Sequence, residues 1–104
     1  MTIKEILLAA RTLILQGWCL GTYARDVNGH PVSPQHVTAT SFCMMGAIWR
    51  VSPGFDRYKH GAMGQLESVV PRDQGKSLGW WQDQPGRTVD DVLAAFDLAI
   101  EKSP

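Results

Sequence analysis

The chain has 104 residues, of which 44% are hydrophobic and 19% charged, and its ten basic residues balance its ten acidic ones. This length predicts a single domain spanning residues 1–104, and the composition is that of a folded protein rather than a disordered one. The pI near 6.8 argues against a surface that binds duplex nucleic acid or an anionic membrane through net charge.

The expected location follows from the apolar segments and the cysteines. No apolar run approaches the ~18 residues that a membrane span needs. Charged residues interrupt the N-terminal apolar segment, unlike in a signal peptide. We therefore expect a cytoplasmic protein in which Cys19 and Cys43 stay reduced.

Hydrophobic periodicity predicts an all-α fold, a compact bundle of about four helices. Thr2 and Glu5 have the spacing of a capping box before the first helix, and Gly17 ends that helix. Thr88 is expected to cap the last helix, and a single helical turn is expected after Ser77.

The middle of the chain predicts two more helices. The stretch from Thr38 to Val51 carries no charge before Arg50. Its apolar residues fall on every side, which predicts a helix buried all round and capped by Thr40 or Ser41. A third helix is expected from Asp56 to Val70. The expected core residues are Ile6, Leu7, Leu13, Phe42, Cys43, Ala47, Ile48, Leu66, Val92, Leu93 and Phe96.

A small β-hairpin or ordered loop is expected after the first helix. Asn28-Gly29 favours a type I′ turn, because both residues tolerate positive φ. Residues 23–27 and 30–32 would be the two arms of the hairpin. An isolated hairpin is marginally stable in water, so Trp18 and Tyr23 are expected to anchor it to the helices.

Three segments of the chain resemble those of one known family. They are Gly17-Trp18-Cys19-x-Gly21-x-Tyr23-Ala24-Arg25-Asp26 followed by Asn28-Gly29, then Phe42-Cys43-x-x-Gly46-Ala47-Ile48, and Trp81-x-Asp83-x-Pro85-x-Arg87-Thr88-x-x-x-Val92-Leu93. In this order they resemble the domain-of-unknown-function family 6197, small uncharacterised bacterial and phage proteins. Members of that family often carry Trp-Asn-Asp where this chain has Trp81-Gln82-Asp83. In the family's Cys-Ala-Leu-Gly-Ala segment, the second residue is Met44 in this chain. The resemblance implies no activity, cofactor or catalytic residue.

Cys43 is the single weak candidate for a catalytic residue, because His30, His36 or His60 could act as its base. The apolar sequence around it favours the alternative of a buried, unreactive thiol. No catalytic residue is therefore assigned, and the sequence favours a protein that is not an enzyme. The segment that begins at Asp26 resembles the start of a calcium-binding loop, but it lacks the further ligands that such a loop requires. Neither a metal nor a cofactor is expected.

Charged and aromatic residues supply six candidates for a binding site. Arg25 or Arg87 could hold a phosphate or carboxylate, or could be clamped inside the protein by Asp26 or Asp83. Adjacent tryptophans on a helix point about 100° apart, so one of the pair at positions 80 and 81 could be exposed to a partner. The candidates are Tyr23, Arg25, Asp26, Trp80, Trp81 and Arg87.

Three functions remain open from the sequence. The leading hypothesis is a non-enzymatic protein-interaction module with a protein partner of unknown identity, a homodimer being possible. The second is a small ligand-binding domain or enzyme, in which Arg25, Asp26, Cys43 and Arg87 converge where the Trp18–Pro34 loop meets the last helix. The third, which the neutral pI disfavours, is nucleic-acid binding by a helix-turn-helix. Its charges would be Arg50, Arg57, Lys59 and His60.

Overall fold

The computed structural model describes residues 1–54, 56–71 and 76–104. The helices are α1 (Ile3–Gln16), α2 (Met44–Val51), α3 (Arg57–Val69), α4 (Leu78–Gln82) and α5 (Val89–Glu101). Two short strands, β1 (Ala24–Arg25) and β2 (Ser41–Phe42), pair in antiparallel fashion, with Ala24 opposite Phe42. The predicted all-α class with a small β element after the first helix is confirmed.

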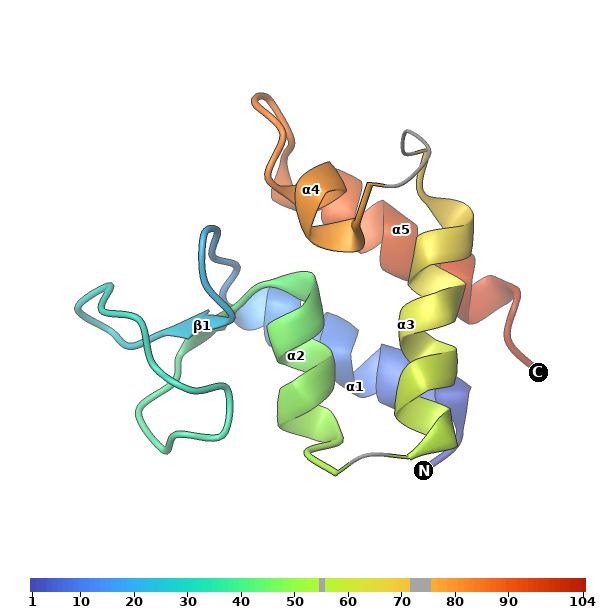
Figure 1. Ribbon diagram of the computed structural model, residues 1–104, viewed down its shortest axis with the longest axis horizontal. Coiled ribbons are helices and arrows are strands. Elements are labelled where there is room, and N and C mark those ends of the chain that lie inside the picture. The colour runs from blue at the N-terminus through green and yellow to red at the C-terminus, as the bar shows by residue number, and fades with distance from the viewer. Residues whose placement is uncertain (55, 72–75) are drawn as a thin grey trace.

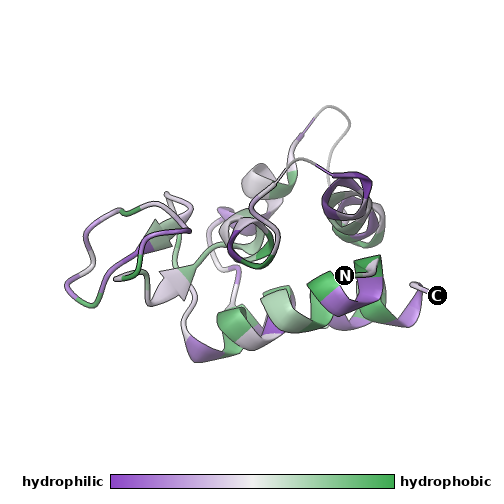
Figure 2. Cartoon of the chain, turned by 90° about the horizontal axis from the view of Figure 1, so that it is seen from below, coloured by the Kyte–Doolittle hydropathy of each residue, from purple (hydrophilic) through white to green (hydrophobic). Residues whose placement is uncertain are grey.

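The helices form two layers (Figures 1 and 2). α1 and α5 pack against each other in one layer, and α2, α3 and α4 lie across it in the other. The long segment between α1 and α2, which contains both strands, extends from one end of the two layers. Within the described ranges, no helix is both long and apolar enough to cross a membrane.

The helix starts that local chemistry predicts are present. The Thr2 hydroxyl accepts the N–H of Glu5, and the Glu5 carboxylate accepts the N–H of Thr2, which completes the capping box. Thr88 forms the same reciprocal pair with Asp91 at the start of α5. Ser77 caps α4 by accepting the N–H of Trp80. These four-residue interactions need no tertiary contact, so the sequence alone suffices to place them.

The central helix is shorter than expected, and its start is a correction to the prediction. α2 begins at Met44 with Cys43 as its cap, so neither Thr40 nor Ser41 caps it. The backbone before it is instead extended: Phe42 donates its N–H to the carbonyl of Gly17. The helix is also not buried all round, because Met45 and Trp49 are only partly buried.

The tight turn at Asn28-Gly29 is present, but its arms differ from the prediction. Only Gly29 has positive φ there, so the turn is not type I′. The two arms share an isolated bridge between Arg25 and Pro31, whereas β1 forms its ladder with β2. Pro31 has no N–H to donate, which explains why the better partner of β1 is the strand that precedes α2.

The core lies between the two helix layers. Nine of the eleven expected residues are buried, and the exceptions, Leu13 and Leu93, pack against the core while partly exposed. Burial of these side chains is the main source of stability, at roughly 25 cal/mol for each Å² of apolar surface removed from water. The described part of the core also includes Ala10, Ile14, Ala24, Met44, Ala62, Val70, Leu78, Trp81, Ala95 and Ala99.

Candidate functional site

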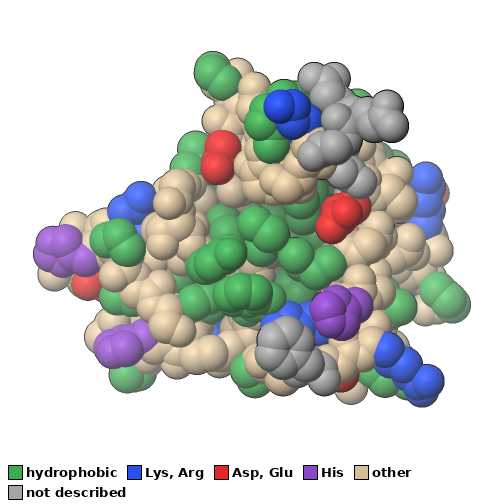
Figure 3. Space-filling model, in the orientation of Figure 1, with side chains coloured by type: hydrophobic (Ala, Val, Ile, Leu, Met, Phe, Trp, Pro, Cys, Tyr) green, Lys and Arg blue, Asp and Glu red, His purple; other side chains and the backbone are tan. Residues whose placement is uncertain are grey.

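Hydrophobic side chains gather in a hollow on the face that α2, α3 and α4 share (Figure 3). Met45 and Trp49 are one turn apart on α2, so they point to the same side of that helix. Lys59 and Met63 are likewise one turn apart on the neighbouring α3. Lys59 Nζ lies 4.7 Å from the centre of the Trp49 ring, which shows that these two sides face each other.

Tyr23 extends this apolar surface toward the β strands. Its ring centre lies 4.6 Å from that of Trp49 in a tilted arrangement, and 42% of the residue is exposed. We call the surface formed by Tyr23, Met45, Trp49 and Met63 the apolar hollow. Three of its four members were not site candidates from the sequence, because sequence spacing does not show which half-buried residues of two helices meet.

A pocket of about 390 Å³ adjoins the apolar hollow. It lies between the loop that follows α1, the start of α2, and α4 with the residue that follows it. Its lining residues are Gly21, Thr22, Tyr23, Cys43, Met45, Gly79, Gln82 and Asp83. The expected site at the Trp18–Pro34 loop therefore has a concave counterpart, but the loop meets α4 there rather than the last helix.

Two side chains fix the start of α2 at the floor of this pocket. Cys43 Sγ accepts the N–H of Gly46 at 3.3 Å. Gln82 Oε1 accepts the buried N–H of Met44 at 2.7 Å and the indole N–H of Trp18 at 3.3 Å. Gln82 thus ties α4, α2 and the segment that follows α1 together, a role that its sequence context did not suggest.

Cys43 is almost fully buried, at 3% exposure, although it borders the pocket. Burial is the main cause that raises the pKa of its thiol, and the hydrogen bond from Gly46 only partly opposes it. Burial also raises the pKa of Cys19. No hydrogen bond in the described part of the chain joins Cys43 to a histidine. This geometry supports the inert thiol over the nucleophile.

Thiol labelling tests this assignment of Cys43. The reactive species is the thiolate, so a buried thiol with a raised pKa should react more than about tenfold more slowly at pH 7 in the folded protein than in denaturant. A Cys19→Ser variant isolates the signal of Cys43, and Ellman's reagent measures the rate. Rapid labelling of folded protein at pH 7 would contradict the inert thiol.

Arg25 and Asp26 are both held by the loop that contains them. Arg25 Nη1 donates to the carbonyl of Gly29 at 2.8 Å, and Nη2 donates to that of Leu20 at 2.9 Å. Asp26 Oδ1 accepts the N–H groups of Asn28 and His30, and these bonds lower the pKa of Asp26, with the one from His30 largest. Arg25 is therefore held inside the protein, as the clamp hypothesis expected, but by carbonyl oxygens and not by the carboxylate of Asp26 or Asp83.

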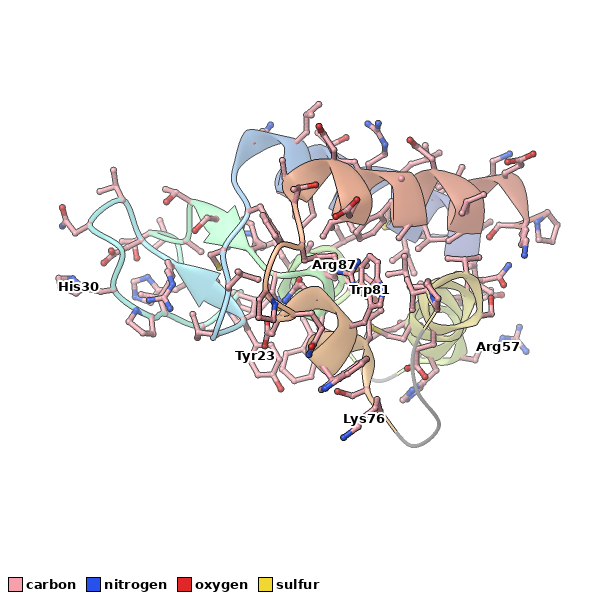
Figure 4. The ribbon with its side chains drawn as sticks, turned by 90° about the horizontal axis from the view of Figure 1, so that it is seen from above. Tyr23, His30, Arg57, Lys76, Trp81 and Arg87 are labelled. Carbon is pink, nitrogen blue, oxygen red and sulfur yellow. The ribbon has the colours of Figure 1, made fainter. Side chains whose placement is uncertain are left out.

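Arg87 is also held internally, against Trp81 (Figure 4). Its Nε donates to the carbonyl of Trp81 at 2.9 Å, and its Cζ lies 4.0 Å from the centre of the indole ring. Trp81 is buried, and its Nε1 has no hydrogen-bond partner in the described ranges. Trp80 is partly exposed, as expected for one member of the pair. Of the six binding candidates, Tyr23 alone lines the pocket.

Two of the four basic residues of the expected helix-turn-helix are held by internal contacts, whereas Arg57 and His60 are exposed. Arg50 Nη1 donates to the carbonyls of Pro34 and His36, both at 2.9 Å. Lys59 is buried beside Trp49. Arg57 lies over the ring of Tyr58. His30, which was considered as a base for Cys43, lies at the far tip of its loop, away from α4 (Figure 4).

Sequence comparison identifies the chain's family. The profile of the Family of unknown function (DUF6197) matches residues 1–102, so the chain belongs to that family. The resemblance drawn from the three sequence segments is thereby confirmed. No curated protein and no solved structure matches the chain significantly. The apolar hollow and the pocket are therefore the features from which a function can be inferred.

Proposed function

We propose that this member of DUF6197 is a non-enzymatic protein-binding module, acting in the cytoplasm, whose apolar hollow receives an apolar segment of a partner protein. The observation that carries this proposal is the gathering of hydrophobic side chains in one hollow over three helices (Figure 3). Contiguous apolar surface of this kind marks interaction sites in soluble proteins.

The side chains of the hollow are of the types that interfaces favour. Tyrosine, tryptophan and methionine are enriched in the buried centre of protein interfaces. Met45 and Met63 are flexible thioethers that can adapt to the shape of a partner. The Trp49 ring packs against Tyr23 and against the Lys59 ammonium, so these two contacts hold the aromatic surface in place.

Affinity capture with three matched baits tests the proposal. We expect Met63→Gln, in the hollow, to lower recovery of bound proteins by about fivefold or more, because truncated interface anchors cost upwards of ~1 kcal/mol. Leu98→Gln is the matched control, since Leu98 is 45% exposed on α5, outside the three helices of the hollow. Nuclease-treated lysate of the source organism and quantitative mass spectrometry provide the measurement.

The results of the capture experiment distinguish docking in the hollow from its absence. Proteins recovered by the wild-type chain and by Leu98→Gln, but depleted with Met63→Gln, support docking in the hollow. Equal recovery by all three baits, or no recovery by any, contradicts it. Circular dichroism of each bait confirms that the substitutions leave the fold intact.

The small-ligand hypothesis is the second proposal, and the pocket beside Cys43 favours it. The pocket volume of about 390 Å³ falls in the usual range for ligand sites, roughly 300–1,000 Å³. An enzyme is less well supported, because Arg25, Asp26 and Arg87 do not line this pocket.

A further inference from the structure

The pocket beside the apolar hollow has an acidic wall. Asp83 lines it, and its Oδ1 accepts a hydrogen bond from Gln82 Nε2 at 3.2 Å. The ion pairs among the residues that the structure describes do not involve Asp83. Asp83 is also exposed, so its carboxylate is accessible to a ligand.

Among the described residues, the carboxylate of Asp83 has no basic neighbour in the lining of the pocket. The described residues that line it include no lysine, arginine or histidine. Arg25 and Arg87 point their guanidinium groups at the carbonyls of Leu20, Gly29 and Trp81, and neither forms an ion pair with Asp83. Burial is the main cause that raises the pKa of the Cys43 thiol, and the charge of Asp83 is the smallest contribution in the same direction.

An aromatic residue, Tyr23, contributes to a second wall of the pocket. Tyr23 is 42% exposed and rests against Trp49. Elsewhere the chain already holds cations over aromatic rings, with Lys59 Nζ 4.7 Å from the ring centre of Trp49. An aromatic ring beside a carboxylate attracts ammonium and guanidinium groups by cation–π and charge-assisted hydrogen bonding.

Tyr23 and Met45 belong both to the pocket and to the apolar hollow, so one bound segment can occupy both. We infer that the pocket binds the ammonium or guanidinium group of a lysine or arginine side chain in the partner segment that docks in the hollow. This inference rests on the proposed function and adds to it a basic residue next to the apolar part of the partner.

Titration of the full chain with N-acetyl-L-arginine amide tests the pocket without any knowledge of the partner. Amide NMR spectra at low salt should show saturable shifts at Thr22, Gly79 and Asp83. The neutral isostere N-acetyl-L-citrulline amide should bind much more weakly. Asp83→Asn should weaken arginine binding about fivefold, as expected for loss of one partly exposed ion pair.

The controls keep the fold and the total charge matched. In Asp83→Asn the new amide would still offer an oxygen to Gln82 Nε2, so the pocket wall should persist. Asp90→Asn removes the same charge from the exposed first turn of α5 and should leave binding unchanged. Tyr23→Leu tests the aromatic wall separately and should also weaken binding. Equal binding of citrulline amide, or undiminished binding to Asp83→Asn, would overturn the inference.

The two proposals fail in different ways. Arginine binding at Asp83 with capture that is insensitive to Met63→Gln would overturn docking in the hollow and leave a pocket for small cations. Capture that depends on Met63, with no arginine binding at Asp83, would leave docking in place and overturn the cation pocket.

Discussion

Replacing Gly46 with alanine is expected to cost at least about 3 kcal/mol of unfolding free energy, because the added methyl group has no room. A Cβ at this position would lie 1.9 Å from the carbonyl oxygen of Tyr23 and 2.7 Å from its carbonyl carbon. Both are backbone atoms, and the same carbonyl accepts the N–H of Cys43. Relief of the clash would therefore require separation of the loop from the start of α2. Urea denaturation monitored by tryptophan fluorescence measures the loss.

Gly64→Ala is the matched control for this substitution. Gly64 is exposed on α3, and a Cβ there would meet no atom within 4 Å. Alanine should stabilise the protein by about 0.5–1 kcal/mol, since glycine is the poorer helix former. If Gly46→Ala lost less than about 1 kcal/mol, the close approach of Tyr23 to α2 would be wrong.

The same contact shows which parts of the fold the sequence could predict. Thr2, Ser77 and Thr88 cap their helices through bonds to residues three positions away, so local pattern was sufficient. The predicted start of α2 was wrong because residues 40–42 are as uncharged as the helix itself and continue its apolar pattern. Their extended form depends on hydrogen bonds to Gly17 and Arg25, more than a dozen positions away in the chain.

The candidate site was predicted less well, for a related reason. Tyr23 was singled out as an aromatic residue, but its partner Trp49 could be identified only once α2 and the loop were placed. Arg25 and Arg87 were expected to pair with carboxylates, yet they bind carbonyl oxygens. Charge patterns in a sequence do not reveal carbonyl partners, because every residue carries a backbone carbonyl. Because the arginines bind carbonyl oxygens, Asp83 has no ion pair among the described residues. This unpaired carboxylate is the basis of the proposed cation pocket.

Gln82→Met is expected to cost about 2–4 kcal/mol, although methionine matches glutamine in length and would remain buried. The substitution removes the acceptor of two N–H groups, those of the Met44 backbone and the Trp18 indole. The Met44 N–H belongs to the first turn of α2, so no carbonyl within the helix can replace the lost acceptor. Thermal denaturation should show a midpoint lowered by roughly 10–20 °C for a domain of this size.

Two further variants show whether the lost acceptor causes this effect. Gln16→Met, at the exposed end of α1, should change stability by no more than about 0.5 kcal/mol. Gln82→Asn keeps an amide oxygen on a side chain shorter by one methylene. It should therefore lose less stability than Gln82→Met. If asparagine were as damaging as methionine, side-chain length rather than the acceptor oxygen would determine how α4 holds the start of α2.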